Sequence, residues 1–523
     1  MRSIYTLLLL AGVILWSSCR EDFETTLSTG DLRFSQDTIF LDTVFTNIGS
    51  STRNFIVYND NDDPISIPSV RLGLGDNSDY RLNVNGIAGQ VFQDVEILAN
   101  DSIFVFVETT LDIEDFESDN GQFLSTDVIQ FDMGGNEQTV DLVTLVQDAI
   151  FLFPGRDDAT GIVEALTING VETSLEGRYL LPDELTFTAD LPYVIFGYMA
   201  VGDPINNSPT TLTIEPGARI HFHDNSGIIV ADNGSLQVNG ALSSDLKVLE
   251  NEVIFEGDRL EPSFAETPGQ WGTILLTDGS VNNSINYTTI KNATIGILNE
   301  SSTTTGSPNL TITNSQLYNH AVAGMIHRFS TVEGSNLVTN NCGQFSMLIQ
   351  LGGTYNFDHC TFANFSSLGI RTIPAVQLDN SIINGDFIEI EDLTAANFTN
   401  CIITGSQSEE FFVNRIEGTL FNFNLSNSII RFDDTFSNFV ENPLFDFDNP
   451  VFYNNVIRGG NDLDFLNPQD NFLQIGEASS ANGLGDITTA QQFPLDLVGT
   501  NRTASPDLGA YQSIVFPDPD DGN

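Results

Sequence analysis

One short pattern recurs through the second half of the chain and constrains its fold more than any other feature. It consists of an Asn, a small residue, a variable residue and a large aliphatic residue, as in DNSIINGD (379–386), TNCIITGS (399–406) and SNSIIRFD (426–433). Successive copies are 18 to 27 residues apart, which is the length of one unit of a solenoid. The leading residues are Asn292, Asn314, Asn341, His359, Asn380, Asn400, Asn427 and Asn454.

The residues that follow each Asn indicate which solenoid this is. In a strand, the small and the large residue lie on one face, and the residue between them lies on the other. Asn also tolerates the left-handed backbone conformation that a tight corner needs. We therefore predict an all-β parallel β-helix with coils stacked about 4.8 Å apart. Its interior is predicted to hold Ser381, Cys401, Ser428, Ile383, Ile403 and Ile430.

Two further segments extend this prediction. LTIEPGARIHFHDNSGIIVADNGSLQVNG (212–240) is typical of first coils, and PGQWGTILL (268–276) continues them. In its residues and their spacing, the region resembles the right-handed parallel β-helix families that include pectate lyases. SPDLGAYQ (505–512) resembles the closing motif of the choice-of-anchor Q group of bacterial surface proteins. The resemblance implies a right-handed parallel β-helix over residues 157–512, followed by an acidic tail at 513–523.

The region before the helix has the period of a β-sandwich. Residues 38–46, 54–59, 101–111 and 139–146 alternate apolar and polar side chains between turn-rich pieces. We predict a sandwich over residues 31–150. TVFTNIGSSTRNFIVYNDNDDPISI resembles the immunoglobulin-like domains of the ASPM, SPD-2 and Hydin type, through Phe45, Asn47, Gly49 and Asn59. That resemblance implies a spacer or a binding module.

The chain begins with a leader. MRSIYTLLLLAGVILWSSC has a basic residue, a short apolar run and then Cys19, which is typical of a signal peptide rather than a membrane span. It resembles a bacterial lipoprotein signal, and the acidic REDFE after Cys19 resembles surface-exported lipoproteins of the Bacteroidetes. The resemblance implies a signal peptide at 1–18, lipidation of Cys19, a tether at 19–30 and a surface-exposed place on the outer membrane. An ordinary secreted protein with an incidental Cys is the alternative.

The charge of the chain restricts its partners. Acidic residues number 71 and basic residues 18, so the net charge is -53 at pH 7. Such a surface repels nucleic acid and anionic headgroups, which leaves the lipid anchor as the contact with the membrane. It attracts divalent cations, and turn clusters such as NDNDDP (59–64) make Ca²⁺ the one cofactor to consider. We otherwise expect no cofactor.

A few polar residues are candidates for a ligand-binding face. They follow the corner Asn by about 9 to 15 residues, where an outward face of a long sheet is expected. Arginines there would suit a carboxylated or sulfated glycan; alternatively, they pair with neighbouring acidic residues. We identify no catalytic motif, and thus no catalytic residue. The candidates are His327, Arg328, Arg371, Glu389, Asn414 and Arg415.

Histidines and cysteines offer weaker candidates. RIHFHD (219–224) places His221 and His223 on one face of a strand, where a metal could bind with a third ligand, although exposed histidines without a metal are commoner. We therefore predict no metal site. Cys342 and Cys360 are expected on consecutive coils, either as a disulfide or, because parallel side chains give poor torsion, as buried free thiols.

The residue between the small and the large column faces outward. It becomes apolar in the later copies, and such a stripe has to be covered. The cover is either the sandwich or a loop of the same chain, or else another protein or a glycan surface. The stripe consists of Ile382, Ile402, Ile429 and Val456.

Two functions follow from these features. The first is a cell-surface lipoprotein whose β-helix is a non-catalytic module for binding, adhesion or envelope structure, with a glycan or a protein as its ligand. The second is a carbohydrate-active enzyme, a polysaccharide lyase or glycoside hydrolase, that acts on an extracellular polysaccharide.

Overall fold

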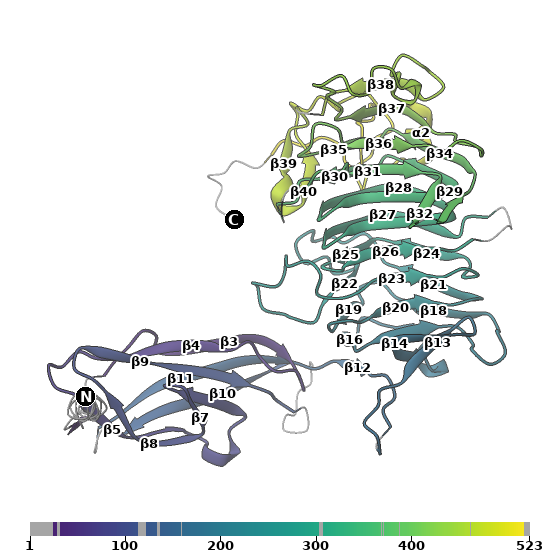
Figure 1. Cartoon of the computed structure of the whole chain (residues 1–523). Coiled ribbons are helices and arrows are strands. Elements are labelled where there is room, and N and C mark those ends of the chain that lie inside the picture. The colour runs from purple at the N-terminus through teal and green to yellow at the C-terminus, as the bar shows by residue number, and fades with distance from the viewer. Residues whose placement is uncertain are drawn as a thin grey trace, which may run out of the picture. The chain divides into compact units, whose positions relative to one another are not determined.

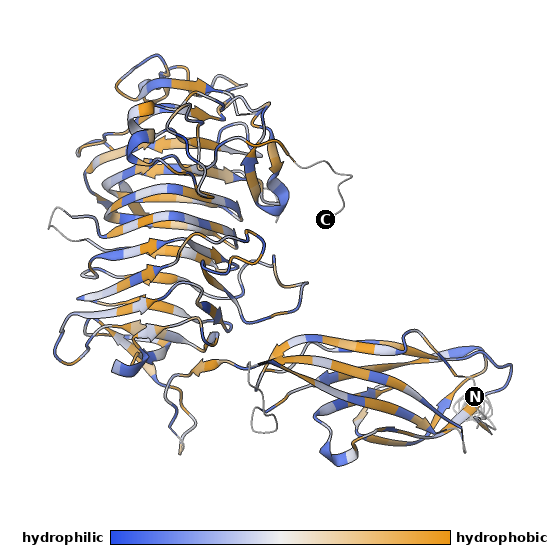
Figure 2. Ribbon diagram, turned by 180° about the vertical axis from the view of Figure 1, so that it is seen from behind, coloured by the Kyte–Doolittle hydropathy of each residue, from blue (hydrophilic) through white to orange (hydrophobic). Residues whose placement is uncertain are grey.

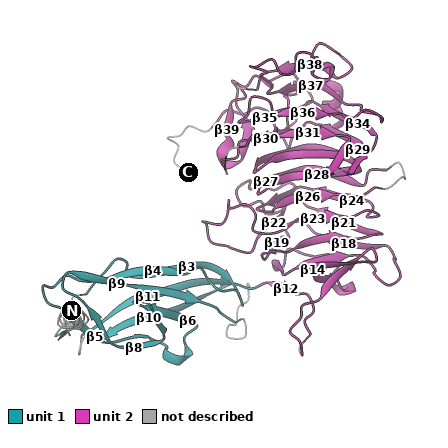
Figure 3. Ribbon diagram, in the orientation of Figure 1, with its two compact units in different colours: residues 1–148 teal, residues 149–523 magenta. Residues whose placement is uncertain are grey.

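The structure is a computed structural model, and it forms two compact units. The chain divides between Asp148 and Ala149, and Figure 3 shows the two units in different colours. No helix in the described part of the chain is long and apolar enough to cross a membrane. The signal peptide and Cys19 lie outside that part. The described residues are 25–28, 32–112, 122–132, 136–157, 159–302, 307–367, 369, 371–385, 387–460 and 462–516.

The first unit is the predicted β-sandwich. One sheet has the order β1-β5-β10-β11-β3 with β8 paired to β5, and the other has the order β2-β4-β9-β6-β7. Alternate residues of both sheets, such as Phe55 and Val140, fill the core between them. The strands are β1 (Thr26–Leu27), β2 (Arg33–Phe34), β3 (Thr38–Phe45), β4 (Arg53–Asn59), β5 (Ile65–Leu72), β6 (Tyr80–Val84), β7 (Ile87–Gly89), β8 (Val91–Ile97), β9 (Asp101–Thr109), β10 (Gln122–Asp132) and β11 (Glu137–Gln147).

The second unit is a parallel β-helix, as predicted (Figure 1). Through its first coils each strand pairs in parallel with the third strand after it, so a coil contains three strands and the stack has three faces. The strands at 310–320, 323–342 and 345–358 continue around corners and are longer. Apolar and polar residues alternate along the strands of both units (Figure 2), because one face of each strand is buried.

The strands of the helix follow the chain order. From the first coil to the middle they are β12 (Ile150–Leu152), β13 (Ala165–Ile168), β14 (Val171–Tyr179), β15 (Thr186–Phe187), β16 (Tyr193–Ile195), β17 (Tyr198–Val201), β18 (Thr210–Ile214), β19 (Arg219–Phe222), β20 (Gly227–Val230), β21 (Gly234–Asn239), β22 (Val253–Gly257), β23 (Ile274–Leu276), β24 (Asn283–Asn286), β25 (Thr288–Lys291) and β26 (Ile295–Asn299). The later ones are β27 (Leu310–His320), β28 (Ala323–Cys342), β29 (Phe345–Asp358), β30 (Thr361–Asn364), β31 (Val376–Asp379), β34 (Leu393–Thr399), β35 (Ile402–Gly405), β36 (Phe411–Asn414), β37 (Asn424–Ile430) and β38 (Tyr453–Arg458).

The boundaries of both units differ from the predicted ones. Thr26–Leu27, assigned to the tether, pairs in parallel with β5 and so belongs to the sandwich. Ile150–Leu152 pairs with β16, so the helix begins before residue 157. Near the other end, Ile514 forms a bridge with Gly476, which places the start of the predicted acidic tail against the helix unit.

Asn does turn the corners, but the predicted series combined two corners. Asn314, His359, Asn400 and Asn427 have positive φ and follow one another in one column, which also contains Asn336. The second corner consists of Asn292, Asn319 and Asn341.

Two members of the predicted series were wrong. Asn380 is not left-handed, and Asn455 rather than Asn454 turns its corner. Amide side chains bond along the first column, because the side chain of Asn336 donates to Oδ1 of Asn314 at 2.8 Å and that of Asn400 to Nε2 of His359 at 2.9 Å. These bonds hold consecutive coils in register.

The predicted interior is confirmed for two of the three copies that predicted it. Cys401, Ser428, Ile403 and Ile430 are fully buried, and the Cys401 amide donates to Oγ of Ser428 at 3.0 Å. In the third copy Ile383 is 61% exposed. Here β32 (Ser381–Asn384) leaves the coil and pairs antiparallel with β33 (Phe387–Ile390). His359 and Asn400 are therefore neighbours in the column, although the hairpin lies between them in the sequence.

The cysteines in the described part of the chain, Cys342, Cys360 and Cys401, are free and buried, which confirms the second of the two predicted states. The predicted neighbours were wrong, because Cys360 lies beside Cys401 and not beside Cys342. Burial raises the pKa of the Cys342 thiol to about 12. It also raises the pKa of Cys360, so both thiols are protonated at neutral pH.

The apolar stripe is covered by the C-terminal part of the same chain, residues 462–516. Ile402 and Ile429 pack against Leu463, Ile475 and Leu508. This part contains β39 (Phe465–Asn467), β40 (Phe472–Ile475) and α2 (Ile487–Gln492). Two members of the predicted stripe lie elsewhere, since Ile382 is in the hairpin and Val456 packs against the interior core.

The SPDLGAYQ motif provides close contacts between this cover and the coils. The Gly509 amide donates to the carbonyl of Asn400 at 2.7 Å, and the Ala510 amide to Oγ1 of Thr361 at 3.1 Å. Gly509 has φ of +87°, and a Cβ there would lie 2.6 Å from Oγ1 of Thr361. Only Gly fits this approach. Arg502 is 1% exposed and donates to Oδ1 of Asn336 at 2.9 Å, which attaches the cover to the corner column.

Two equivalent isoleucines of the repeated pattern test this assignment. We expect Ile403→Ala to lower the free energy of unfolding by about 2–5 kcal/mol, because it leaves a cavity inside the coil. The matched control, Ile383→Ala, should change it by less than about 0.5 kcal/mol, because that side chain is in solvent. Chemical denaturation followed by circular dichroism measures both, and equal losses would show that both copies are inside the helix.

Candidate functional site

A cavity lies on the outer face of the helix, between the sheet and its C-terminal cover; we call it the outer groove. It has a volume of 210 Å³. Three parts of the chain contribute to it: the sheet, the loops at 241–252 and 258–270, and the C-terminal cover. The lining residues are Leu246, Leu249, Glu252, Glu266, Gln316, Tyr318, Asp470, Asn471, Phe472, Leu473, Gln474, Leu497, Val498 and Tyr511.

The sheet provides the floor of the groove. Ser315 and Leu317 are fully buried inside the coil, so alternation along β27 points Gln316 and Tyr318 outward. Gln316 belongs to the same outward column as the apolar stripe. By register this column consists of Thr289, Gln316, Val338, Thr361, Ile402 and Ile429. The column is polar where the groove lies and mostly apolar where the cover packs on it.

The C-terminal cover provides one wall. Phe472 is 55% exposed beside the cavity, whereas Leu473 is buried in the cover. Tyr511, from the SPDLGAYQ motif, donates its hydroxyl to Oε1 of Gln316 at 3.4 Å and thereby connects the wall to the floor. The groove thus presents two tyrosines and a phenylalanine together with amide and carboxyl groups. Binding sites for small molecules have this combination of apolar walls and few polar groups.

Several polar groups in the groove have no partner within the part of the chain that the structure describes. They are the Tyr318 hydroxyl, the Gln316 side-chain nitrogen and the side-chain amide of Gln474. Glu252 is 6% exposed, and its carboxyl accepts one bond, from Oγ1 of Thr289 at 3.3 Å. Burial raises the pKa of Glu252. These groups are available to donate to and accept from a ligand.

A second, smaller cavity of 150 Å³ adjoins the outer groove; we call it the side cavity. Both are lined by Glu266 and Asp470. Glu266 accepts hydrogen bonds from the side chains of Asn319 and Asn471. Asn471 has φ of +67° and donates to Oδ1 of Asn319 at 3.2 Å, so the second corner column fixes this junction.

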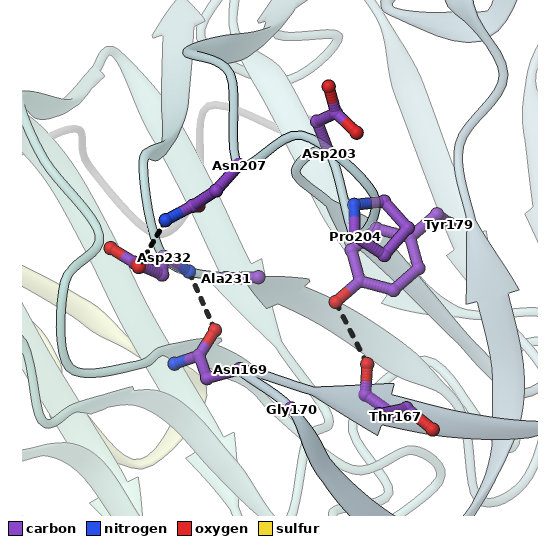
Figure 4. Close-up of a pocket in the computed structure, with 9 residues that line it drawn as sticks. All are labelled: Thr167, Asn169, Gly170, Tyr179, Asp203, Pro204, Asn207, Ala231 and Asp232. Atoms are coloured by element: carbon purple, nitrogen blue, oxygen red, sulfur yellow. Dashed lines mark hydrogen bonds between the residues drawn. The ribbon is translucent and has the colours of Figure 1, made fainter.

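Another pocket, of 270 Å³, lies at the first coils, and its polar groups bond to one another (Figure 4). Asn169 accepts from the Asp232 amide at 2.8 Å, and Asn207 donates to the Asp232 carboxylate at 2.8 Å. The Tyr179 hydroxyl donates to the carbonyl of Thr167 at 3.0 Å. Amides of its own loop lower the pKa of Asp203 to about 2. These groups hold the β13–β14 hairpin on the helix and leave little for a ligand.

The predicted ligand-binding face is only partly assembled. Arg328 and Asn414 share one column, which by register runs Glu300, Arg328, Gln350, Asp379 and Asn414. Arg328 donates to Glu300 and, at 3.3 Å, to Gln350, so its charge is paired.

The other four candidates lie apart from this column. His327 is fully buried inside the coil, which corrects its predicted outward position. Arg371 is buried with Glu410 at 2.5 Å, and Arg415 pairs with Glu417. Glu389 is exposed on the β32–β33 hairpin. The arginines are therefore paired with acidic residues, the alternative reading of these positions.

The two histidines of RIHFHD also have protein partners. Nδ1 of His223 bonds to Asp258 at 2.6 Å, which raises its pKa, and its ring stacks on Phe196. His221 is 4% exposed beside Glu256 and the carbonyl of Gly257, and burial lowers its pKa. Within the described ranges, no group of three or more His, Cys, Asp or Glu side chains could hold a metal ion.

Sequence reasoning missed the groove because it is built from parts far apart in the chain. By the repeated pattern Gln316 faces outward, but its neighbours Tyr318, Glu252 and Tyr511 belong to no repeated pattern that would mark them. The available signal was the change from polar to apolar residues along the outward column between Gln316 and Ile402.

Comparisons with solved structures find only distant likenesses. One is to the catalytic unit of a GH87 alpha-1,3-glucanase from Streptomyces thermodiastaticus, with 11% identity, 72% of this chain, 79% of that chain and a TM-score of 0.25. Another is to a family 123 glycoside hydrolase from Clostridium perfringens, with 12% identity, 23% of this chain, 24% of that chain and a TM-score of 0.16. The E. coli chaperone DraB matches at 11% identity over 29% of this chain and 80% of that chain, with a TM-score of 0.15.

At such TM-scores these likenesses carry no argument about function. No protein-family model matches the chain, and no curated protein matches it.

The polar column beside Arg328 yields a prediction of pH dependence. Burial raises the pKa of Asp379 from 3.8 to about 6. The folded state therefore binds this proton more tightly than the unfolded state does. The proton's contribution to the free energy of unfolding is lost as pH rises from about 4 to 6. We expect Asp379→Asn to be more stable than the wild type by about 3 kcal/mol or less at pH 7, and not at pH 3. Denaturation at both values measures this difference.

The exposed Asp76 provides the matched control for this experiment. Asp76→Asn should show no such gain at pH 7, because its carboxyl is in solvent in both states. A gain for Asp379→Asn that is equal at both pH values would contradict the explanation by burial.

Proposed function

We propose that the protein is a surface lipoprotein whose β-helix binds a glycan in the outer groove without altering it. The observation that carries this proposal is the set of unpartnered hydrogen-bonding side chains, Gln316, Tyr318 and Gln474, beside the aromatic rings of Phe472 and Tyr511. Sugars present hydroxyl groups at the edge of an apolar ring face. Amide and phenol groups suit the hydroxyls, and aromatic rings suit the faces.

Two features favour binding over chemistry. The groove is formed by elements attached at many points, including Arg502, Gly509 and Asn471, so it is preformed. Its floor also lacks a catalytic constellation, since Tyr318 and Gln316 are neutral at physiological pH and burial raises the pKa of Tyr318 further. A long, rigid helix on a lipid tether would then hold an extracellular polysaccharide at the cell surface.

One residue favours hydrolysis as a second candidate function. Glu252 lines the groove, and burial raises the pKa of its carboxyl, which is the direction of shift that a general acid needs. Hydrolysis of a glycosidic bond also needs a second carboxyl group across the bond. Incubation with polysaccharides, followed by an assay for new reducing or unsaturated ends, distinguishes the two functions. Product formation that is lost in Glu252→Gln would establish the enzyme.

Removal of the unpartnered groups should weaken binding. We expect Tyr318→Phe and Gln474→Ala each to lower the affinity for a neutral oligosaccharide about 3- to 30-fold, the effect of one or two hydrogen bonds. Isothermal titration calorimetry measures this after a glycan array has identified the oligosaccharide. Tyr179→Phe is the matched control, because its hydroxyl bonds within the protein away from the groove. Equal losses in all three variants would place the site elsewhere.

The lipid anchor is proposed from the sequence, and it has a separate test. Cys19→Ala should release the protein from the membrane fraction into the soluble fraction, because the chain would lose its acyl chains. Incorporation of labelled palmitate into the wild type and its absence from the variant provide the chemical control. Protease treatment of intact cells then shows whether the protein faces outward. Retention of the variant in membranes would contradict anchoring through Cys19.

A further inference from the structure

We propose that the outer groove and the side cavity are two subsites for one uncharged oligosaccharide chain, which passes over Glu266 and Asp470. This inference rests on the proposed glycan binding and specifies its ligand. Two observations carry it: Glu266 and Asp470 line both cavities, and no Lys or Arg is among the described residues that line either of them.

The shared lining residues indicate a ligand of more than one unit. The outer groove, at 210 Å³, and the side cavity, at 150 Å³, are each below the 300–1,000 Å³ range of drug-sized sites. Each therefore suits one small unit rather than a branched ligand. Because Glu266 and Asp470 line both, a ligand that leaves one cavity at these residues enters the other. Consecutive sugars of one chain satisfy this arrangement.

The junction between the subsites is held rigidly. Asn319, Asn340 and Asn471 are buried to nine-tenths or more. Asn340 donates to Oδ1 of Asn471 at 3.1 Å, and Asn471 in turn donates toward Glu266 at 3.4 Å. The position of the Glu266 carboxylate is thus fixed before a ligand arrives, which reduces the entropic cost of binding across the junction.

The charges around the cavities select against anionic sugars. The carboxylates of Glu266 and Asp470 line both of them, and no Lys or Arg is among the described residues that do so. The nearby Lys291 pairs with Glu256 at 2.8 Å, and Arg219 donates to backbone carbonyls such as that of Glu252 at 2.6 Å. A uronate or sulfate would meet carboxylates without a compensating cation, in a chain with a net charge of -53. The ligand class is therefore a neutral glycan, opposite to the anionic glycan that the arginine pattern implied.

Calorimetry with defined probes tests the inference. The probes are neutral oligosaccharides of glucose, mannose and galactose with one to four units, and oligogalacturonides of equal lengths. We expect affinity for the preferred neutral series to rise at least tenfold between one unit and two or three. We also expect oligogalacturonides to bind at least tenfold more weakly than the neutral chains of the same length. Equal affinity for all lengths, or tighter binding of oligogalacturonides, would overturn the inference.

Two variants at exposed positions separate the subsites. Ser367 is exposed at the side cavity, and the indole of Ser367→Trp should fill that cavity. The affinity should then no longer rise with the number of sugar units, while the affinity for a single unit is kept. Ser367→Ala removes the hydroxyl without filling the space and should keep the gain. Asp470→Asn, also at an exposed residue, should reduce the ratio of the affinity for the neutral chain to that for the oligogalacturonide at least threefold. A length-dependent gain that survives Ser367→Trp would contradict the side cavity as a subsite.

The outcomes separate this inference from the proposed function. Absence of binding to every glycan of the array and the series would refute the function itself. Binding that depends on Tyr318 but not on chain length would leave glycan binding intact and refute only the second subsite.

Discussion

The left-handed corner is the constraint on which the rest of the helix depends. At Asn336, Asn400 and Asn427 the backbone turns with positive φ, and amide side chains along this column bond to the coil before them. The corner therefore fixes both the direction of the chain and the register of the stack. Once the register is fixed, alternation decides which residues enter the interior, such as Ile403, and which face outward, such as Gln316. The floor of the outer groove follows directly from it.

The outward column connects stability with function. Its later members, Ile402 and Ile429, are apolar and need a cover, which residues 462–516 provide. Where the column becomes polar at Gln316, the cover no longer seals the sheet, and the wall bearing Phe472 and Tyr511 overhangs a cavity. The same segment that protects the apolar stripe thus forms the site. Variation in this segment can change the site while the coils stay as they are.

The sequence predicted the repeating part of the fold well, because each coil repeats the same two local requirements. One is a residue that can turn a tight corner, and the other is a set of side chains that fill the interior. Cys401, Ser428 and Ile403 lie where that argument places them. It failed at Ile383, where an inserted hairpin copies the pattern without belonging to a coil. Local sequence cannot distinguish these cases, because in both an Asn is followed by alternating strand residues.

The site was less predictable than the fold. Arg371 suggested a ligand face from its spacing, but its partner Glu410 is 39 residues away in sequence and buries it. Tyr318 and Tyr511 line the same groove although they are far apart in the chain. This arrangement depends on where the C-terminal cover docks, and SPDLGAYQ indicates a closing motif without indicating its docking position. Long-range contacts of this kind follow from the assembled coils and not from any local pattern.

A crystal structure of the protein with a neutral oligosaccharide that binds it tests the central claim most directly. The account predicts electron density for the sugar over Gln316 and Tyr318, with the next unit beyond Glu266 in the side cavity. Density beside Arg328 and Asn414 instead, with the outer groove empty, would contradict it.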